Sequence, residues 1–465
     1  MTRLTSFPSY DLLKSIGRIA DKYSIQAFVI GGFVRDIFLG RQSYDIDIVC
    51  LHDSIFLADK ISQVLHFDNL VIYKTFGTAM IKKDNLQIEF VNTRKESYSY
   101  TSRNPVVING TFQDDQQRRD FTINTLAIGL NENNFGEIIN TMHGLEDLNN
   151  KIIRTPIDPG KTFCDDPLRM LRAIRFATQL GFTISPETFE AIIEQKERIK
   201  IITKERIRDE INKILSSPQP SIGFQLLYNS GILDIIMPYI AKLNGKIQIE
   251  SFSHKDIFLH TLQVVDNVSR ESDNIWLRWA ALLHDIAKPQ TKKFDPKYGF
   301  SFHGHEIIGA RMVKNIFYDL HLPKNKIKYI EKLIRLHLRP IAIAQDIVSD
   351  SGVRRLAFDA GEELNDLMLL CKADITSHNS KKVMEYMDNF KKVEMKIKDI
   401  EAKDNIRNLQ PILNGEEIMK KFNLPPGPKV GQIKTLLKTA IINGEVKNTY
   451  EDLLYYLDNI LKIKV

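Results

Sequence analysis

Cysteine and long apolar runs are both scarce in this sequence. Its 465 residues include three cysteines, Cys50, Cys164 and Cys371, which lie far apart and form no CxxC pair. This spacing argues against a disulfide framework and against a thiolate zinc site. No apolar run approaches the roughly 18 residues that a membrane-spanning helix needs. We therefore expect a cytoplasmic protein.

Internal repeats and low-complexity tracts are missing as well, which argues against a repeat architecture. A composition of 43% hydrophobic and 26% charged residues is that of an ordinary soluble globular protein. The net charge of +6 is compatible with a polyanionic partner, but it fits a merely basic protein equally well. At this length we expect about three domains.

Strand and helix patterns are mixed in the first 150 residues. Residues 27–30 are typical of a short apolar strand, 33–39 of a helix, and 44–50 of a strand with alternating faces. From about residue 160 the apolar spacing is helical and remains so to the end. We therefore expect an α/β head followed by an all-helical remainder.

Two further segments of the head have recognisable patterns. Residues 78–94 predict a hairpin that turns at Asp84 and Asn85. Polar residues crowd the segment 97–119, which predicts a long loop. Loops of that length inside a compact domain are usually functional or disordered.

Two aspartates alternate with isoleucines in the strand expected at residues 44–50. Because side chains on a strand alternate between its faces, Asp45 and Asp47 project to the same side. Neighbouring carboxylates repel each other unless a cation lies between them, and hard oxygen ligands of this kind suit Mg²⁺. Glu89, on the polar face of the hairpin, is a candidate third carboxylate. Without further context, a solvated strand face is the more common explanation.

A glycine pair precedes this strand. Gly31 and Gly32 lie at the start of the helix expected at 33–39, where unpaired N–H groups and the helix dipole attract phosphate. Arg35, in the first turn, is placed to hold the same phosphate oxygens. Together, the turn and the aspartates predict a site for a nucleoside triphosphate and a metal ion.

These residues resemble the signature of a known superfamily. The resemblance begins with "GGFVRD" and "DID" and continues in order through "RRDFTINTLAI", "GLEDL", "DDPLRMLRAIRF" and "KERIRDEINKIL", within residues 31–215. This series is similar to the nucleotidyltransferase superfamily, in the branch of bacterial tRNA CCA-adding enzymes and poly(A) polymerases (class II). It implies a polymerase β-like head that transfers nucleotides with Mg²⁺ held by Asp45 and Asp47.

The segment "DDPLRMLRAIRF" predicts a helix with Asp166 at its N-cap and Pro167 at its first position. On spacing alone, its arginines would be solvated. The resemblance implies instead that this segment binds the incoming nucleotide and that "RRD" contacts the triphosphate and ribose. The nucleotide-binding residues so implied are Gly31, Gly32, Arg35, Arg119, Asp120, Asp166, Arg169, Arg172 and Arg175.

A carboxylate and a guanidinium can select two of the four bases. Cytosine and adenine both present an amino donor beside a ring-nitrogen acceptor. Asp166 can accept from the amino group while Arg169 donates to the ring nitrogen. Guanine and uracil place a carbonyl where that amino group should be, so the carboxylate would face another acceptor. The pair would admit C and A and reject G and U.

Histidines concentrate in the second half of the chain, and "LRWAALLHDIAKP" contains a His-Asp pair. Their order and context resemble the HD phosphohydrolase domain. Imidazoles and carboxylates from several helices can build a mono- or dinuclear site for Ni²⁺, Mn²⁺, Fe²⁺ or Mg²⁺ that activates water. The resemblance implies six metal ligands: His260, His284, Asp285, His305, His337 and Asp374.

The resemblance predicts an α+β protein with four segments. These are a catalytic head at 1–150, a helical neck at 151–250, an HD domain at 251–380, and a helical RNA-binding tail at 381–465. The leading hypothesis is addition or repair of the tRNA 3′-terminal CCA from CTP and ATP. The alternatives are a poly(A) polymerase, partial addition of C or A, and an HD phosphohydrolase whose head only holds RNA.

Overall fold

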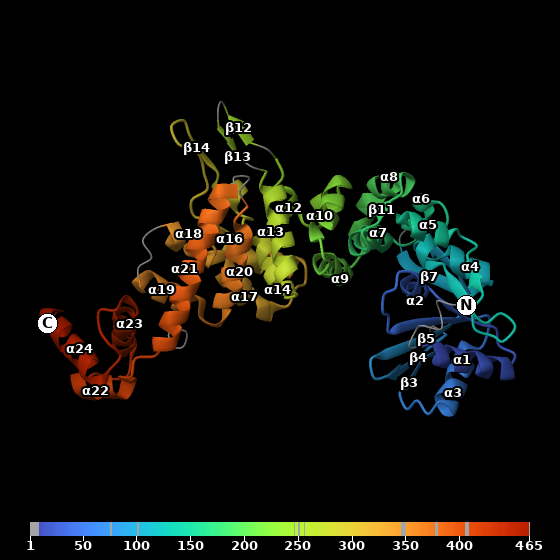
Figure 1. Ribbon diagram of the computed structural model, residues 1–465, viewed down its shortest axis with the longest axis horizontal. Helices are drawn as coiled ribbons and strands as arrows, with labels where there is room; N and C mark the ends of the chain where they lie inside the picture. Colours follow the sequence, from blue (N-terminus) through green and yellow to red (C-terminus); the bar gives the residue numbers. More distant parts are fainter. Residues whose placement is uncertain are drawn as a thin grey trace. The chain divides into compact units, whose positions relative to one another are not determined.

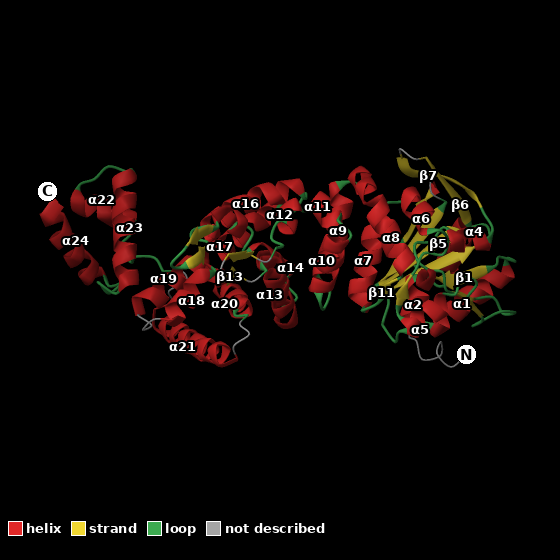
Figure 2. Cartoon of the chain, turned by 90° about the horizontal axis from the view of Figure 1, so that it is seen from above, coloured by secondary structure: helices red, strands yellow, loops and turns green. Residues whose placement is uncertain are grey.

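The structure is a computed structural model that describes most of the chain. Contacts between residues divide the chain into two compact units, Met1–Met237 and Pro238–Val465. Each unit is described by itself (Figures 1 and 2). The described residues are 9–74, 77–99, 102–245, 247–249, 252–254, 256–345, 350–376, 380–404 and 409–464.

A seven-stranded mixed sheet forms the centre of the first unit, with the strand order β3-β4-β5-β2-β1-β8-β9. The pair β2–β5 is parallel. Its other neighbouring strands pair in antiparallel fashion. The strands are β1 (Ala27–Ile30), β2 (Asp45–Cys50), β3 (Leu70–Tyr73), β4 (Thr78–Lys83), β5 (Leu86–Asn92), β8 (Ala127–Gly129) and β9 (Ile138–Ile139).

The alternating pattern of β2 divides the sheet into two faces. Ile46 and Ile48 are fully buried on one face. Asp45 and Asp47 project from the other, as the period of two predicts. Helix α3 (Ser54–Val64) packs on β4 and β5 and also contacts α1 (Tyr10–Lys22). The short helix α2 (Gly32–Phe38) connects β1 to β2 and packs against β2. These elements confirm the mixed α/β head.

The predicted hairpin at 78–94 is confirmed. Strands β4 and β5 are antiparallel, and Lys83 pairs with Leu86 across the turn. Asp84 adopts a left-handed conformation with φ of 53°, which aspartate tolerates better than most residues.

The predicted loop at 97–119 is wrong. Its first part forms a hairpin of β6 (Arg94–Ser99) and β7 (Ser102–Asn109), and α4 (Phe112–Gln117) follows. Helix α4 begins with a capping box in which Thr111 and Asp114 satisfy each other's backbone N–H groups. The polar composition concealed both elements, because backbone pairing and capping do not require an apolar sequence.

The first unit continues as helices, and α7 packs against both α9 and α10. A short parallel pair, β10 (Ile152–Ile153) with β11 (Thr183–Ile184), brings the segment before α6 beside the segment after α7. The helices are α5 (Gly144–Asn150), α6 (Pro159–Asp165), α7 (Leu168–Leu180), α8 (Pro186–Gln195), α9 (Lys204–Leu215), α10 (Pro220–Asn229) and α11 (Ile232–Ile236).

The second unit is also mainly helical. It includes two short strand pairs that the helical prediction missed. They are β12 (Ile247–Ile249) with β13 (Phe252–His254) and β14 (Lys293–Asp295) with β15 (Gly299–Ser301). Its helices are α12 (Pro238–Ala241), α13 (Ile257–Glu271), α14 (Ile275–Leu283), α15 (Lys288–Thr291), α16 (His305–Asp319), α17 (Ile327–Leu336), α18 (Leu338–Gln345), α19 (Asp350–Ala360), α20 (Leu364–Asp374), α21 (Ser380–Asp404), α22 (Gly415–Phe422), α23 (Pro428–Asn443) and α24 (Tyr450–Lys464).

The four-segment division at residues 150, 250 and 380 stays a prediction. The last three helices share their own apolar cluster, which includes Leu413, Ile418, Leu437 and Leu453. Every described helix is too short or too polar to cross a lipid bilayer.

Candidate active sites

The parallel pairing of β2 with β5 places carboxylates of the first unit side by side. In this register Asp47 lies opposite Glu89, and Asp45 precedes Asp47 on the same face. The turn after β1 adjoins them, since a Cβ atom at Gly31 would lie 3.2 Å from Asp47 Oδ2 and 3.0 Å from Arg119 Nη1. Gly31 has a φ of 85°, which disfavours any side chain there. The acids, the turn and one guanidinium therefore meet at one point.

The charges at this point are not balanced. Burial, together with Asp45, raises the pKa of Asp47, although Arg119 opposes the shift. Burial and the neighbouring Asp47 raise the pKa of Glu89. Adjacent carboxylates whose ionised forms are disfavoured suit a cation such as Mg²⁺, which usually takes one or two carboxylates and completes its shell with water and phosphate. The residues present fit that group.

Arg35 is already engaged inside the protein. Its Nη1 donates to Asn124 Oδ1 at 2.9 Å, and its Nε donates to Asp36 Oδ1 at 2.9 Å. The Gly31 N–H is also engaged, because it donates to the Leu126 carbonyl. A phosphate at this turn would therefore have to use other donors, and Arg119 is the cation beside Gly31. Phosphate contacts by Arg35 stay a prediction.

Asp120 and Arg172 contact each other. The Arg172 Nε donates to Asp120 Oδ2 at 2.8 Å, and its Nη2 donates to the same oxygen. Asp120 also accepts from the Phe121 N–H and the Asn124 side chain, each at 2.9 Å. Burial opposes the charged form of Asp120, but Arg172 and these hydrogen bonds hold its pKa well below the usual range. The pair joins the segment after α4 to the middle of α7.

The residues predicted to read the base lie at the start of α7. The helix begins at Leu168, later than predicted, but the Asp166 Oδ1 still accepts from the Leu168 N–H at 3.1 Å. The other oxygen, Oδ2, lies 3.8 Å from Arg206 Nη2 on α9. Arg169 Nη2 donates to the Arg118 carbonyl at 2.6 Å. A guanidinium carries five N–H donors, so this bond leaves others for a ligand.

Sequence reasoning assigned no role to Phe176, which lies under three arginines. The guanidinium carbons of Arg175, Arg35 and Arg172 are 4.0, 5.0 and 5.4 Å from the centre of its ring. Arg175 also pairs with Glu210 on α9 at 2.6 Å. The arginines predicted as a nucleotide-binding stripe thus make internal contacts too. The sequence held one sign of this cluster, because arginine recurs every three residues up to the position directly before Phe176.

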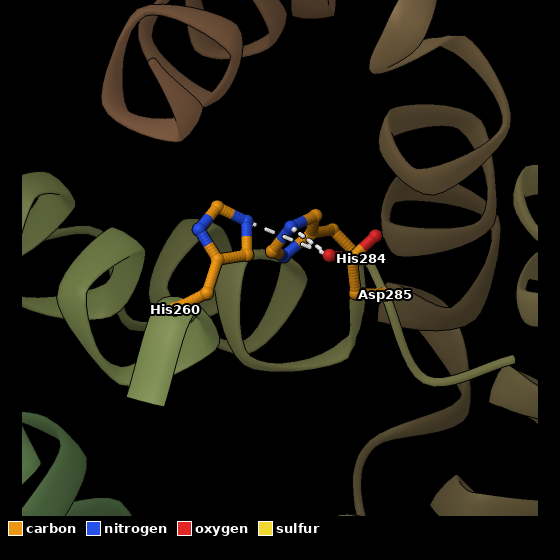
Figure 3. Close-up of side chains that lie close together, drawn as sticks. All are labelled: His260, His284 and Asp285. Carbon is orange, nitrogen blue, oxygen red and sulfur yellow. Dashed lines mark ion pairs between the residues drawn. The ribbon is translucent and has the colours of Figure 1, made fainter. Parts of the chain in front are cut away.

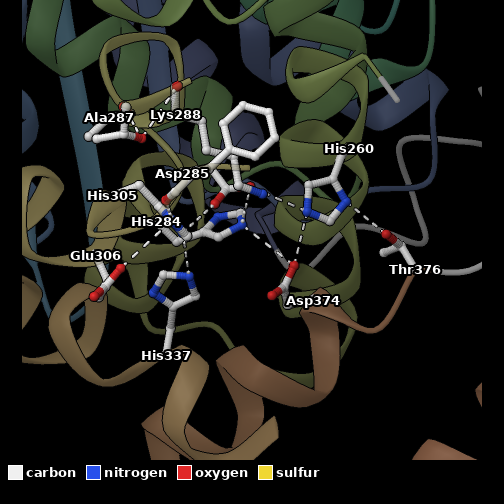
Figure 4. A network of polar contacts seen from close by, with 12 residues as sticks. His260, His284, Asp285, Ala287, Lys288, His305, Glu306, His337, Asp374 and Thr376 are labelled. Carbon is white, nitrogen blue, oxygen red and sulfur yellow. Dashed lines mark hydrogen bonds and ion pairs between the residues drawn. The ribbon is translucent and has the colours of Figure 1, made fainter. Parts of the chain in front are cut away.

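All six predicted HD residues come together in the second unit (Figure 4). Figure 3 shows three of them, His260, His284 and Asp285, from close by. His260 lies on α13, and His305 is the first residue of α16. The other histidines directly follow helices, His284 after α14 and His337 after α17. Asp374 ends α20. The exposed His303 of "FHGHE" is not in the cluster, whereas His305 is buried within it.

Asp285 lies at the centre of this cluster. Its Oδ1 is 3.3 Å from His305 Nε2, and its Oδ2 is 3.1 Å from His284 Nε2 and 3.5 Å from His260 Nε2. A carboxylate shared in this way can bridge two cations. Within the described part of the chain, two groups have ligand atoms within 4.8 Å of one another: His260, His284 and Asp285, and Asp285, His305 and His337.

Backbone carbonyls fix the orientation of three of the imidazoles. The Nδ1 atoms of His284, His305 and His337 lie 2.7, 2.8 and 2.6 Å from the carbonyls three residues earlier. A carbonyl only accepts, so each Nδ1 carries a proton, and each Nε2 faces other side chains of the cluster. His260 Nδ1 is 2.7 Å from Thr376 Oγ1.

The centre favours a positive charge. His284 Nε2 and both Asp285 oxygens are buried, and their partners are each other and the neighbouring charged or titratable side chains of the cluster. Burial lowers the pKa of His284, but Asp285 and Asp374 outweigh it and raise this pKa to about 10. A proton or a divalent cation can supply the charge, and the mixed nitrogen and oxygen donors suit a transition metal. The residues fit a metal centre.

Lys288 is a further charged neighbour that the sequence did not single out. Its Nζ lies 2.6 Å from Asp285 Oδ2. Lys288 follows Asp285 by three residues in "HDIAK", a spacing that places both on the same side of the turn. This spacing could have identified Lys288 from the sequence.

Three family models match the chain in order. They are described as "Poly A polymerase head domain" at residues 27–154, "Probable RNA and SrmB- binding site of polymerase A" at 181–243, and "HD domain" at 257–379.

Curated relatives match over most of their length. An A-adding tRNA nucleotidyltransferase of Deinococcus radiodurans is 33% identical over 352 residues, covering 73% of this chain and 77% of the relative. A CC-adding tRNA nucleotidyltransferase of Thermus thermophilus is 27% identical and covers 90% of each chain.

Solved structures share the fold. The Thermotoga maritima CCA-adding enzyme complexed with tRNA has a TM-score of 0.65 at 22% identity, covering 99% of this chain and 98% of the other. The Bacillus stearothermophilus CCA-adding enzyme in complex with CTP has a TM-score of 0.68 at 21% identity, covering 98% of each chain.

The charge imbalance of the head predicts a stability gain from Asp47→Asn. The folded-state pKa of Asp47 is raised, so its ionisation costs stability as pH rises above the usual 3.8. With divalent ions chelated, the variant should melt a few degrees higher at pH 7, and the gain should shrink toward pH 4. Thermal denaturation at both pH values measures this. The exposed Glu137→Gln is the control, and an equal gain at both pH values would contradict the assignment.

The HD cluster predicts stabilisation by a divalent transition metal. Binding only to the folded state at 100 times the dissociation constant adds about 2.7 kcal/mol. Ni²⁺ or Mn²⁺ should therefore raise the melting temperature by roughly 5–10 °C. His337→Ala should lose most of this rise, whereas His303→Ala, at an exposed position, should retain it. Equal responses of the two variants would exclude His337 as a ligand.

Proposed function

The chain belongs to the family of class II tRNA nucleotidyltransferases and poly(A) polymerases, and we propose that it adds or repairs the 3′-terminal CCA of tRNA. Membership of this family makes it a nucleotidyltransferase. The proposed substrates are CTP, ATP and a tRNA 3′ end. Relatives are named for adding A, CC or CCA, and the order of addition is what the experiment below decides.

The observation that carries this proposal is the meeting of Asp47, Gly31 and Arg119 beside Glu89. Asp45 and Asp47 would hold Mg²⁺, with Glu89 as a third carboxylate. The ion would lower the pKa of the RNA 3′-hydroxyl and neutralise charge on the phosphates. Arg119 would hold the triphosphate at the turn. The hydroxyl would then attack the α-phosphorus in line, forming the new phosphodiester bond as pyrophosphate leaves.

Base choice would fall to Asp166 and Arg169 at the start of α7. Asp166 Oδ1 is engaged by the Leu168 N–H, so Oδ2 is the oxygen that would accept from the amino group of C or A. Arg169 would donate to the ring nitrogen with donors not used on the Arg118 carbonyl. Arg172 and Arg175 would act mainly through their contacts with Asp120 and Glu210.

A second activity is proposed for the HD centre. Its six side chains would hold one or two divalent cations, which would supply the charge that activates water for hydrolysis of a phosphoester. The position of Asp285 supports this role, because its two buried oxygens lie 3.1 to 3.5 Å from Nε2 atoms of His260, His284 and His305. Which ion is bound, Ni²⁺, Mn²⁺, Fe²⁺ or Mg²⁺, belongs to the proposal.

The deciding experiment incubates the protein with tRNA that lacks its last three nucleotides and with each labelled triphosphate. Ordered addition of C, C and A followed by a stop is the expected result. A long A tract would identify a poly(A) polymerase, and addition of only C or only A would identify a partial enzyme. No addition, combined with phosphoester hydrolysis, would favour an HD hydrolase with an RNA-holding head.

Asp45→Ala should reduce nucleotide addition by about 10²–10³-fold or more, because it removes charge stabilisation at the reacting phosphates. Affinity for tRNA should remain close to that of the wild type, since the ion serves the chemistry rather than docking. Addition rates and tRNA titration measure the two effects. Full activity of the variant would remove the metal assignment.

His284→Ala should abolish any phosphoester hydrolysis while nucleotide addition continues, because the two centres use separate residues. Parallel assays of both activities on the same preparation test this. Loss of both activities in a folded variant would show that the domains are coupled.

A further inference from the structure

Phe176 is buried in a cluster of charged groups. Its ring is 6% exposed and lies within 5.4 Å of the guanidinium carbons of Arg35, Arg172 and Arg175. The Phe121 ring meets it nearly edge-on, with centres 5.8 Å apart and planes at 82°. A guanidinium is attracted to the face of an aromatic ring, and the attraction is stronger away from water.

Three guanidinium groups around one ring would repel each other unless each had its own counter-charge. Each of them has one. Arg35 Nη2 is 2.9 Å from Asp36 Oδ1, and Arg175 Nε is 2.6 Å from Glu210 Oε2. The third, Arg172, donates to Asp120, as described above.

These pairs reach the ring from different elements. Arg35 and Asp36 lie on α2, directly after the glycine turn, and Glu210 lies on α9. Asp120 belongs to the segment after α4, and its Oδ1 also accepts from Asn124, the residue that receives Arg35. The ring itself is part of α7. A closed network therefore connects the turn beside the carboxylates, the segment after α4, and the helix that begins near Asp166.

We propose that Phe176 is a positioning residue for base selection, holding α7 at a fixed distance from the catalytic turn through its three arginines. This inference rests on the proposed function, because it assumes that Asp166 and Arg169 read the base. A helix transmits a shift along its length, so loosening its middle displaces both residues relative to the nucleotide. If Asp166 and Arg169 move by a fraction of an ångström, their hydrogen bonds no longer distinguish an amino group from a carbonyl on the base.

A simpler role is that Phe176 only fills the core. The variant Phe176→Leu distinguishes the two roles. Leucine retains a large apolar side chain but has no π face, so it loses the arginine contacts and keeps most of the burial. Phe182 offers a matched control, because it is 7% exposed, lies just after the same helix, and has no cation over its ring among the described residues.

The test compares Phe176→Leu, Phe176→Tyr and Phe182→Leu with the wild type on tRNA lacking CCA. The measured quantities are kcat and KM for CTP, ATP, UTP and GTP, and thermal denaturation gives the loss of stability. Equilibrium titration of CTP and UTP gives a selectivity that does not depend on addition.

We expect Phe176→Leu to lower the preference for CTP over UTP at least tenfold, in both kcat/KM and binding. Phe176→Tyr should keep the wild-type preference for CTP. Phe182→Leu should also keep this preference, although it should lose about as much stability as Phe176→Leu. Equal selectivity of the two leucine variants would overturn the inference. A wild type that adds neither C nor A would instead refute the proposed function, and the binding ratio would still judge the role of Phe176.

Discussion

Repulsion between carboxylates on neighbouring strands determines what the head can do. The parallel register of β2 and β5 places Asp47 opposite Glu89, and Asp45 projects from the same face. Burial makes the charge on Asp47 still less favourable. A cation would relieve this repulsion, and the adjoining glycine turn with Arg119 offers a place for phosphate groups that share the same cation.

The two centres differ in how exposed a bound cation would be. In the head, Asp45 is exposed and Asp47 is half-buried, so water and phosphate would complete the shell of a bound ion. In the HD centre, His284, Asp285 and His337 are at most 1% exposed, and backbone carbonyls orient the two imidazoles. An open site suits a nucleotide that supplies ligands of its own. A closed site suits an ion that stays bound and activates water.

Local pattern was enough to predict the parts of the fold that repeat at short range. The period of two placed Asp45 and Asp47 on one face, and the turn residues located the hairpin at 78–94. Contacts between distant segments were not accessible in this way. The pairing of Asp47 with Glu89 depends on a parallel register, and the burial of Arg35 depends on Asn124, far along the chain. The polar hairpin at 94–109 was missed because its stability comes from backbone pairing.

The ion pair between Asp120 and Arg172 has a consequence for ionic strength. The Asp120 side chain is 8% exposed, and mobile ions screen such a pair much less than they screen charges on the surface. Contacts between surface lysines or arginines and an RNA backbone weaken steeply as salt displaces them. Rising salt should therefore release a nucleic acid bound through such surface contacts long before it loosens the internal framework. Raising the salt concentration should thus weaken RNA binding without unfolding the first unit.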